Sequence, residues 1–446
     1  MIRLKKSMKG KQIINNRAYK QFCKLYKISY FIILVFASIT NLTACIKREE
    51  IIKQESIAVG EIRNDTINNT INDTVNVTAN DISNADNEED NMNIEKGENL
   101  ALDTGIQWMK EEILVYKPSR GGVWYPRMYH LQDGRILCGF DTNEDGARAV
   151  IKIVSSEDGG YTWSLDGYKG TNNPEYDCAN ANFIELDNGD IWLAYRANVM
   201  EGEEYYSSIR VNVSKDGGST WIEHSIVAEE KGKGGVYEPQ FQFIGDQVAV
   251  FYANDSLNVV KNNRQQNIEY KIWTGDSWSR KYIASNGTKT YSRDGMPVLC
   301  RLADGSYGLV IESTALHPSY EFIIQLKLSP DGMDWSGPLK DIYIPNKINK
   351  KAGAPYIVTL SDGRLLVSFQ TDEDASNNGD AFSKMKVMIS KDSSGNEFLP
   401  ITEPFDTPDG FASSWNSLLS YDNSLLAVTS TNYPWECIML RIGKVK

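Results

Sequence analysis

The chain has 446 residues, of which 41% are hydrophobic and 24% charged, and its 47 Lys and Arg against 59 Asp and Glu give a formal net charge of −12. A surface this acidic repels the phosphate backbone, which excludes nucleic acid as the expected partner, whereas a neutral sugar carries no such penalty.

The first 45 residues are basic and then apolar. They carry nine Lys and Arg and no acid, and the apolar run Tyr30 to Ile39 follows, which is typical of a signal peptide. The rest of the chain keeps 38 Lys and Arg against 59 acidic residues, or 21 net negative charges. The segment ends in Leu42-Thr43-Ala44-Cys45, which resembles the lipobox of bacterial lipoproteins, in which the Cys carries the lipid. We therefore expect residues 1–45 to be a lipoprotein signal peptide and Cys45 to anchor an exported protein at the outer face of a bacterial membrane. An ordinary signal peptide or a single membrane-spanning helix is the alternative.

Residues 46–104 repeat Asn, Asp, Thr and Glu with almost no aromatic residue, as in the run from Asn84 to Asn93. Such a segment cannot bury enough apolar surface to offset the entropy lost on ordering. The composition predicts a disordered tether between the anchor and the domain that follows.

Four cysteines follow Cys45, at positions 138, 178, 300 and 437, and no two of them have C-x-x-C spacing. Neither a zinc site nor a redox motif is expected. None of the three histidines has a partner at metal-ligand spacing, so we expect no metal and no cofactor.

A unit of one polar turn and one apolar, β-prone run repeats six times from residue 105 onward. Steps of 55 to 60 residues separate the second residues of the turns, which are Gly134, Gly189, Asp246, Gly305, Gly363 and Asn423. Turns such as Asp-Gly and Asn-Gly favour two-residue hairpins between strands, and an even spacing indicates one supersecondary unit used repeatedly. Units of this length suit four-stranded blades.

A second motif keeps register with the first. Ser156 to Trp163 and Ser214 to Trp221 both read S-x-D-x-G-x-T-W, and shortened copies occur at Ser329 to Trp335, Thr274 to Trp278 and Ser390 to Asp392. These copies resemble the Asp box of sialidases and related propeller glycosidases. In such a turn Asp and Ser accept backbone N–H bonds, Gly supplies the permissive backbone angle, and Trp packs between blades.

Together the repeats predict an all-β fold, a six-bladed β-propeller with Asp-box repeats that spans residues 105–446 and that we expect to be a monomer. The last unit lacks a strand, so we expect residues Gln107 to Val115 to complete it.

The central pocket of a propeller forms at the mouth of its channel, beside the innermost strands. Polar and aromatic residues precede each hairpin turn, which is the usual composition of a sugar pocket. They are Tyr125-Pro126-Arg127, Tyr176-Asp177, Tyr237-Glu238-Pro239, Arg293-Asp294, Gly353-Ala354-Pro355-Tyr356 and Ser413-Ser414-Trp415-Asn416.

Several of these segments, with Val310-Ile311-Glu312 and Ser368 to Asp372, resemble glycoside hydrolase family 93, the exo-α-L-arabinanases, over roughly Tyr125 to Asn416. The resemblance implies a retaining hydrolysis, by two glutamates, that releases arabinobiose from α-1,5-linked arabinan. The matching positions are Glu238 and Glu312. A retaining glycosidase needs one carboxylic acid to protonate the leaving oxygen and one carboxylate to attack the anomeric carbon. The sequence favours Glu238 as acid/base and Glu312 as nucleophile without separating the two roles.

The remaining candidates would bind the substrate. Arg127 and Arg293 could orient it, because a guanidinium makes paired hydrogen bonds to oxygens. Asp294 could support Arg293 or a sugar hydroxyl. The candidate stacking faces are Tyr125, Tyr176, Tyr356 and Trp415, and Asp177 and Arg196 are weaker candidates.

Two other functions remain open. A sialidase would bind the carboxylate of its substrate with three arginines, but only Arg127 and Arg293 stand at suitable positions and the fifth blade offers Gly353-Ala354 instead. Asp141 could imitate the acid of that family. A lipid-anchored propeller that binds glycans without cutting them is the third possibility.

Overall fold

The computed structural model describes residues 103–446 except 147, 165–166, 172, 202–203, 233, 257–264 and 315–320. The predicted signal peptide, Cys45 and nearly all of the predicted tether lie outside the described residues.

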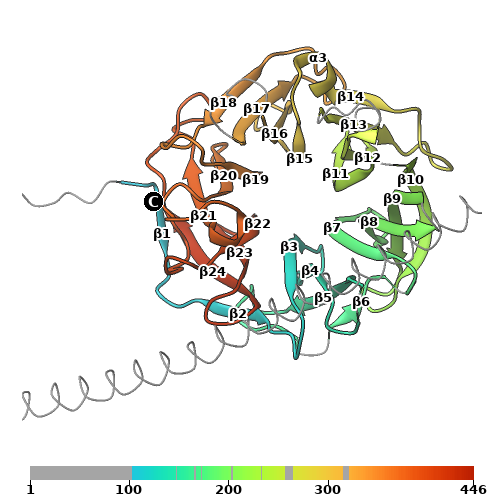
Figure 1. Cartoon of the computed structure of the whole chain (residues 1–446), viewed down its shortest axis with the longest axis horizontal. Coiled ribbons are helices and arrows are strands. Elements are labelled where there is room, and N and C mark those ends of the chain that lie inside the picture. Colours follow the sequence, from blue (N-terminus) through green and yellow to red (C-terminus); the bar gives the residue numbers. More distant parts are fainter. Residues whose placement is uncertain are drawn as a thin grey trace, which may run out of the picture. The chain divides into compact units, whose positions relative to one another are not determined.

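The described residues form six antiparallel sheets arranged as blades around a central channel (Figure 1), which confirms the predicted six-bladed propeller. Within each of the first five blades the strands lie in chain order from the channel outward. The strands of the first three blades are β3 (Val123–His130), β4 (Ile136–Thr142), β5 (Val150–Ser156) and β6 (Tyr168–Lys169); β7 (Asp177–Glu185), β8 (Ile191–Glu201), β9 (Glu204–Ser214) and β10 (Ile222–Gly232); and β11 (Val236–Ile244), β12 (Gln247–Asn254), β13 (Asn267–Ile272) and β14 (Tyr282–Ser285).

The remaining blades follow the same order, with a three-stranded fifth sheet. Their strands are β15 (Gly295–Arg301), β16 (Tyr307–Ser313), β17 (Ile323–Ser329) and β18 (Leu339–Tyr343); β19 (Ala352–Thr359), β20 (Leu365–Thr371) and β21 (Lys384–Ile389); and β22 (Ser413–Tyr421), β23 (Ser424–Thr431) and β24 (Cys437–Val445) with β1 (Ile106–Trp108) and β2 (Ile113–Tyr116). The six hairpins between the first and second strands carry the repeated polar turns, as predicted from their spacing.

The last blade is completed by the start of the domain. Ile106 pairs with Val445 and Ile113 pairs with Leu440, so β1 and β2 both lie against β24. The prediction that residues Gln107 to Val115 close the ring is confirmed, although this segment forms two short strands instead of one.

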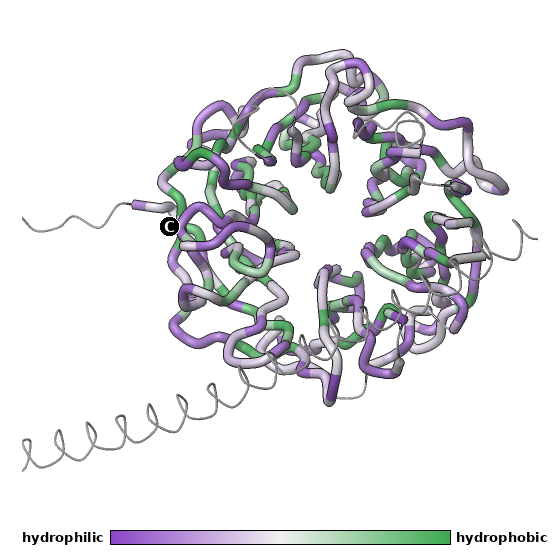
Figure 2. The backbone as a smooth tube through the Cα atoms, viewed as in Figure 1, coloured by the Kyte–Doolittle hydropathy of each residue, from purple (hydrophilic) through white to green (hydrophobic). Residues whose placement is uncertain are grey.

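Much of the hydrophobic core lies between neighbouring blades. One cluster joins Cys138 and Phe140 of the first blade to Val428 and Leu440 of the sixth. Hydrophobic stretches follow the strands, whereas many outer loops are hydrophilic (Figure 2). The cysteines at positions 138, 178, 300 and 437 are free and buried among these layers.

The S-x-D-x-G-x-T-W turns make the predicted hydrogen bonds. Asp216 accepts from the backbone N–H of Thr220 at 2.9 Å, and Ser214 Oγ accepts from the N–H of Gly218 at 2.8 Å. Gly218 has φ of +93°, which favours glycine. The indole of Trp221 donates to the carbonyl of Gly218 at 2.9 Å and is buried. These turns therefore stabilise the blades and lie away from the channel.

Helices are nearly absent from the described part of the chain, which contains α3 (Gly287–Thr290) and the 3-10 turn η1 (Asp380–Phe382). Within that part, no helix has the length and apolar character needed to cross a membrane.

Candidate active site

A ring of β-bulges surrounds the channel mouth. Each innermost strand loses register with its neighbour once, and a single non-glycine residue at that point has φ between 47° and 62°. A bulge bends the strand and redirects its side chains, and strained backbone of this kind gathers at functional sites. The six bulge residues are Tyr125, Asn180, Glu238, Met296, Ala354 and Trp415.

A second ring lies on the neighbouring strands, directly opposite the start of each bulge. Its members are Asp141, Arg196, Ala253, Glu312, Gln370 and Ser430. Three of them accept the backbone N–H of the bulge residue in the following blade. Asp141 accepts from Asn180 at 2.9 Å, Glu312 from Ala354 at 3.0 Å, and Gln370 from Trp415 at 2.7 Å. These bonds hold three acceptor side chains at the mouth and join adjacent blades there.

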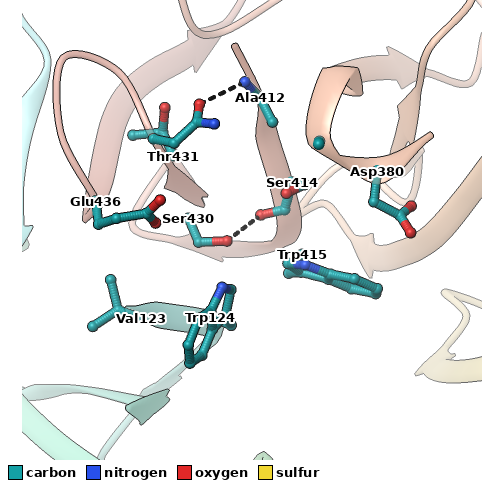
Figure 3. Close-up of a pocket in the computed structure, with 11 residues that line it drawn as sticks. Val123, Trp124, Asp380, Ala412, Ser414, Trp415, Ser430, Thr431 and Glu436 are labelled. Atoms are coloured by element: carbon teal, nitrogen blue, oxygen red, sulfur yellow. Dashed lines mark hydrogen bonds between the residues drawn. The ribbon is translucent and has the colours of Figure 1, made fainter. Parts of the chain in front are cut away.

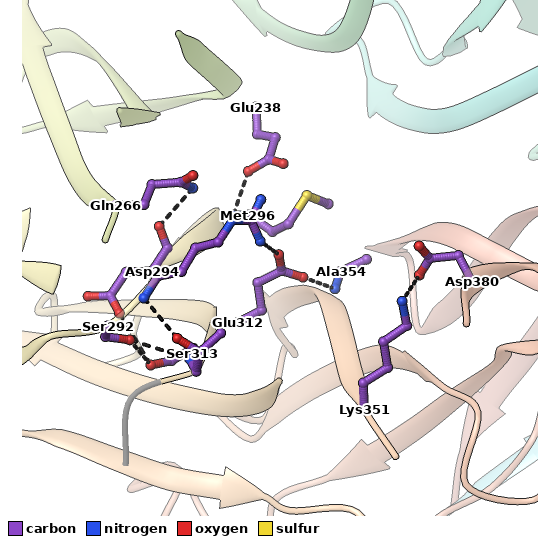
Figure 4. Close-up of polar contacts among 12 residues, drawn as sticks. Glu238, Gln266, Ser292, Asp294, Met296, Glu312, Ser313, Lys351, Ala354 and Asp380 are labelled. Carbon is purple, nitrogen blue, oxygen red and sulfur yellow. Dashed lines mark hydrogen bonds and ion pairs between the residues drawn. The ribbon is translucent and has the colours of Figure 1, made fainter. Parts of the chain in front are cut away.

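In the third blade, Glu238 supplies the acceptor that the second ring lacks there. The second-ring residue there is Ala253, which has no side-chain acceptor. The N–H of Met296 instead donates to Oε2 of Glu238 at 2.7 Å (Figure 4). The carboxyl group of Glu238 is thereby directed toward the fourth blade.

Glu312 is almost buried, with 7% of its surface exposed, and it is held at both oxygens. Arg293 Nη1 donates to Oε1 at 3.2 Å, and the N–H of Ala354 donates to Oε2 (Figure 4). A Cβ atom at Gly353 would lie 2.7 Å from Oε2, so the carboxylate fits only because glycine occupies that position. Both donors favour the ionised form of Glu312.

The structure brings the two predicted glutamates together. Both lie beside Met296 in Figure 4, and their charges interact. Burial, followed by the negative charge of Glu312, raises the pKa of Glu238 to about 7. Burial also raises the pKa of Glu312, while the charge of Arg293 and the N–H of Ala354 oppose that shift. The two carboxyl groups repel each other when both are ionised, and only Glu312 is paired with a guanidinium. Near neutral pH this arrangement favours an ionised Glu312 and a protonated Glu238.

A central hollow of about 480 Å³ opens above Glu238. This volume falls within the usual range of ligand pockets. Its lining residues come from the first, second, third, fourth and sixth blades, and they are Trp124, Tyr125, Asp141, Asn143, Ala149, Asp177, Ala179, Asn180, Arg196, Glu238, Met296 and Trp415. Burial raises the pKa of Asp141 to about 8, so this carboxyl group can donate a hydrogen bond at neutral pH. Glu312 is not part of this lining.

Five of the candidate residues named from the sequence line the central hollow, namely Glu238, Tyr125, Asp177, Arg196 and Trp415. Asp177 accepts from the N–H of Ala149 at 2.8 Å, and its carboxylate lies 4.0 Å from Arg196. Arg293 is not among the residues that line the hollow, and its guanidinium contacts Glu312. The structure thus brings these residues together at the hollow, with Glu312 close enough to Glu238 for their charges to interact, and their roles stay predictions.

The predicted orienting role of Arg127 needs correction. Only 2% of its surface is exposed, and Nη1 donates to the backbone carbonyls of Pro126, Trp415 and Asn416. Its guanidinium lies 3.6 Å from the centre of the Tyr125 ring. Arg127 therefore supports the floor of the hollow from below and does not reach a ligand.

Asp294 and Tyr356 are also buried. The carboxylate of Asp294 accepts from the hydroxyl of Ser285, in the third blade, and from that of Ser313, in the fourth, and Asp294 is not among the residues that line the hollow. The ring of Tyr356 belongs to the core and lies 5.3 Å from the guanidinium of Arg127, which excludes it as a stacking face. The hydroxyl of Tyr176 accepts from Arg210 and faces a different, outer hollow.

Trp124 and the pair Gln370 and Asp380 were not predicted. A signal for the second ring does exist in the sequence, because every member stands seven residues after the second residue of its hairpin turn, from Gly134 to Asp141 and from Gly305 to Glu312. No comparable signal marks Trp124. Among the described residues, no group of three or more His, Cys, Asp or Glu side chains could hold a metal ion.

Comparison with solved structures shows what this architecture resembles. The chain is similar to a family 93 α-L-arabinofuranosidase of Fusarium graminearum solved with arabinobiose, at 19% identity and a TM-score of 0.59, over 76% of this chain and 98% of that one. It is likewise similar to the Penicillium chrysogenum α-L-arabinanase solved with arabinobiose, at 19% identity and a TM-score of 0.60, over 76% of this chain and 99% of that one.

The NanB sialidase of Streptococcus pneumoniae is a more distant match, at 12% identity and a TM-score of 0.52, over 74% of this chain and 70% of that one. This chain has the six-bladed fold of the sialidase-like propellers. Neither a protein-family profile nor a curated protein sequence matches it.

Proposed function

We propose that this propeller is a retaining exo-glycosidase that acts on α-1,5-linked L-arabinan and releases arabinobiose. The observation that carries the proposal is the arrangement of Glu238 and Glu312, two coupled carboxyl groups beside Met296 of which one is held by a guanidinium. Two structural neighbours, one named as an α-L-arabinofuranosidase and one as an α-L-arabinanase, were both solved with arabinobiose and support the choice of sugar.

In the first step the carboxylate of Glu312 attacks the anomeric carbon. The bond from that carbon to the leaving oxygen breaks, and Glu238 supplies the proton that the leaving oxygen takes up. Arg293 and the N–H of Ala354 keep Glu312 ionised for the attack, while burial keeps Glu238 protonated.

In the second step Glu238 removes a proton from water, the water oxygen bonds to the anomeric carbon, and the Glu312 carboxylate leaves. Two displacements at one carbon retain its configuration.

Exchange of Glu238 or Glu312 for Gln tests the proposal. Each variant should release no arabinobiose from linear arabinan while keeping its β-rich circular dichroism spectrum. Glu397→Gln, an exposed glutamate paired with Lys391, is the matched control and should keep full activity. Retained activity in both active-site variants contradicts the mechanism, and a parent protein that binds but never cuts arabinan favours the glycan-binding alternative.

A sialidase is less well supported by this site. Arg127 is buried against backbone carbonyls, and Gly353-Ala354 stands where a further arginine would be needed. Release of sialic acid from sialyl-lactose, with no action on arabinan, would reverse this preference.

We also propose that the protein is exported as a monomer and anchored through a lipid on Cys45. The basic and apolar start of the chain and the Ala44-Cys45 ending support this location. Cys45→Ala should lose labelling by radioactive palmitate and appear in the soluble fraction, whereas labelling that persists contradicts the anchor.

A further inference from the structure

A second hollow of about 240 Å³ opens beside the central one (Figure 3). It lies between the first strand of the first blade, the sixth blade and η1. Its lining residues are Val123, Trp124, Asp380, Ala381, Ala412, Ser414, Trp415, Ser430, Thr431, Asn432 and Glu436. The volume is below the range of about 300–1,000 Å³ that holds a whole ligand, so this hollow suits one part of a longer molecule.

The two hollows share Trp124 and Trp415, which makes them neighbouring sections of one depression. Both indoles appear along one side of the second hollow in Figure 3. Trp124 keeps 37% of its surface exposed. An exposed indole at the boundary of two hollows offers an apolar face on which a sugar ring can lie.

The position of the Trp124 indole depends on the absence of a side chain at Gly122. A Cβ atom at Gly122 would lie 2.2 Å from Cζ2 of Trp124, so the indole packs back over the backbone of its own chain. Any other residue at position 122 would push the ring away. The exposed tryptophan thus has a defined position although it lies at the surface.

Trp415 is fixed by a chain of hydrogen bonds. The backbone N–H of Trp415 donates to Oε1 of Gln370, and Nε2 of Gln370 donates to Oδ1 of Asp380 at 2.9 Å. Lys351 completes the chain with an ion pair of 2.7 Å to the same oxygen (Figure 4). These bonds fix the backbone from which the indole of Trp415 projects, and the centre of the indole lies 6.4 Å from the centre of the Tyr125 ring.

The polar groups of the second hollow suit hydroxyl groups. Asp380 and Glu436 face it from opposite sides in Figure 3, and Ser414, Ser430 and Thr431 lie between them. Carboxylates accept hydrogen bonds from sugar hydroxyls, and their negative charge disfavours acidic sugars. The chemistry therefore matches a neutral glycan.

We infer that the second hollow is an additional sugar-binding subsite, which holds the continuation of a neutral polysaccharide whose end occupies the central hollow. This inference rests on the proposed function. It adds that the preferred substrate is longer than the disaccharide released, with Trp124 and Trp415 beneath the chain where it passes between the hollows.

Binding of two ligand lengths to the inactive Glu312→Gln variant tests the inference. Linear α-1,5-arabinohexaose should bind about tenfold more tightly than arabinobiose in calorimetric titrations, which corresponds to a free-energy difference of about 1.4 kcal/mol. In the same background, Trp124→Ala and Ala381→Trp should each abolish that advantage. The first removes the indole, and the second fills the hollow from an exposed position on η1. Ala381→Trp should leave the affinity for arabinobiose unchanged.

Two further variants make the result specific. Trp124→Phe keeps an aromatic face and should restore most of the advantage. Tyr168→Ala, which removes an exposed aromatic ring from the outer strand of the same blade, should have no effect.

Equal affinity for the two ligands, or an advantage that survives both Trp124→Ala and Ala381→Trp, overturns the inference while leaving the proposed function intact. If neither ligand binds and the parent protein does not cut arabinan, the proposed function fails and the subsite fails with it.

Discussion

Nη1 of Arg293 donates to Oε1 of Glu312 across 3.2 Å, so the guanidinium charge lies beside the carboxylate of the proposed nucleophile. The guanidinium opposes the effect of burial and lowers the pKa of Glu312 relative to the same carboxyl group without it. The acidic limit of activity should therefore depend on Arg293.

Arg293→Gln should reduce kcat by roughly 10²-fold, the usual cost of losing one charge-stabilising donor. Because the pKa of Glu312 rises when the cation is lost and the nucleophile must be ionised, the acidic limb of kcat/KM should move to higher pH. A pH profile from 4 to 9 measures both effects. Arg301→Gln, at the exposed end of β15, the strand that follows Arg293, is the control, and an unmoved acidic limb would contradict the assignment of Glu312.

Activity should also fall as pH rises through about 7. Glu238 acts as an acid only when protonated, and its pKa is raised to about 7. The basic limb of kcat for linear arabinan should thus lie near that value. A limb well above pH 9 would indicate that a different group supplies the proton.

Glu238 should cost the protein stability at neutral pH. Its folded pKa of about 7 exceeds the ordinary 4.5, so the folded state binds more protons than the unfolded state between these values, and stability falls as pH rises across that window. Glu238→Gln should therefore stabilise the fold at pH 8 by on the order of 3 kcal/mol and by almost nothing at pH 4. Urea unfolding at the two pH values measures the difference, and a gain that does not depend on pH would exclude this origin.

Gly353→Ala should slow the proposed hydrolysis of arabinan through one steric contact. The added Cβ would lie 2.7 Å from Oε2 of Glu312, and Gly353 has an ordinary φ, so the carboxylate must move. A displacement of the nucleophile by about 1 Å can cost roughly 10²-fold in rate. Gly337→Ala, where the nearest atom would be 3.5 Å away, should behave as the parent protein. Full activity of Gly353→Ala on arabinan would show that the position of Glu312 is not critical.

The polar turns should matter for stability and not for catalysis. Ser214 is fully buried, and Ser214→Ala leaves the N–H of Gly218 without its acceptor, at a cost of about 1–3 kcal/mol. Ser219→Ala, in the exposed part of the same turn, should change the free energy of unfolding much less. Urea denaturation compares the free energies of unfolding of the two variants. Unchanged kcat in both would show that the turn affects stability and not catalysis.

The sequence predicted the fold because its signal is repetitive. Six hairpin turns at nearly even spacing fix the number of blades, and the same spacing brings Glu238 and Glu312 to one end of the channel. Even the missing strand could be found, because the last repeat is short and the segment before the first turn is β-prone.

The orientation of individual side chains could not be predicted. The bulge at Tyr125 interrupts the alternation of side chains along β3, and Arg127 consequently lies beneath the hollow. Asp294 immediately precedes β15 and is buried among serines, which no local pattern reveals. Trp124 depends on the small size of Gly122, a relation visible only once both positions are placed in space.

The last strand of the chain, β24, carries both β1 and β2, and the N–H of Lys446 donates to the carbonyl of Gly105 at 3.0 Å. The earliest described strands of the domain therefore pair only once β24, residues Cys437–Val445, has been synthesised. Deletion of those residues would open the ring and expose the apolar faces of the first and sixth blades to aggregation. A segment attached after Lys446 would emerge beside Gly105, where the pairing of β1 with β24 begins.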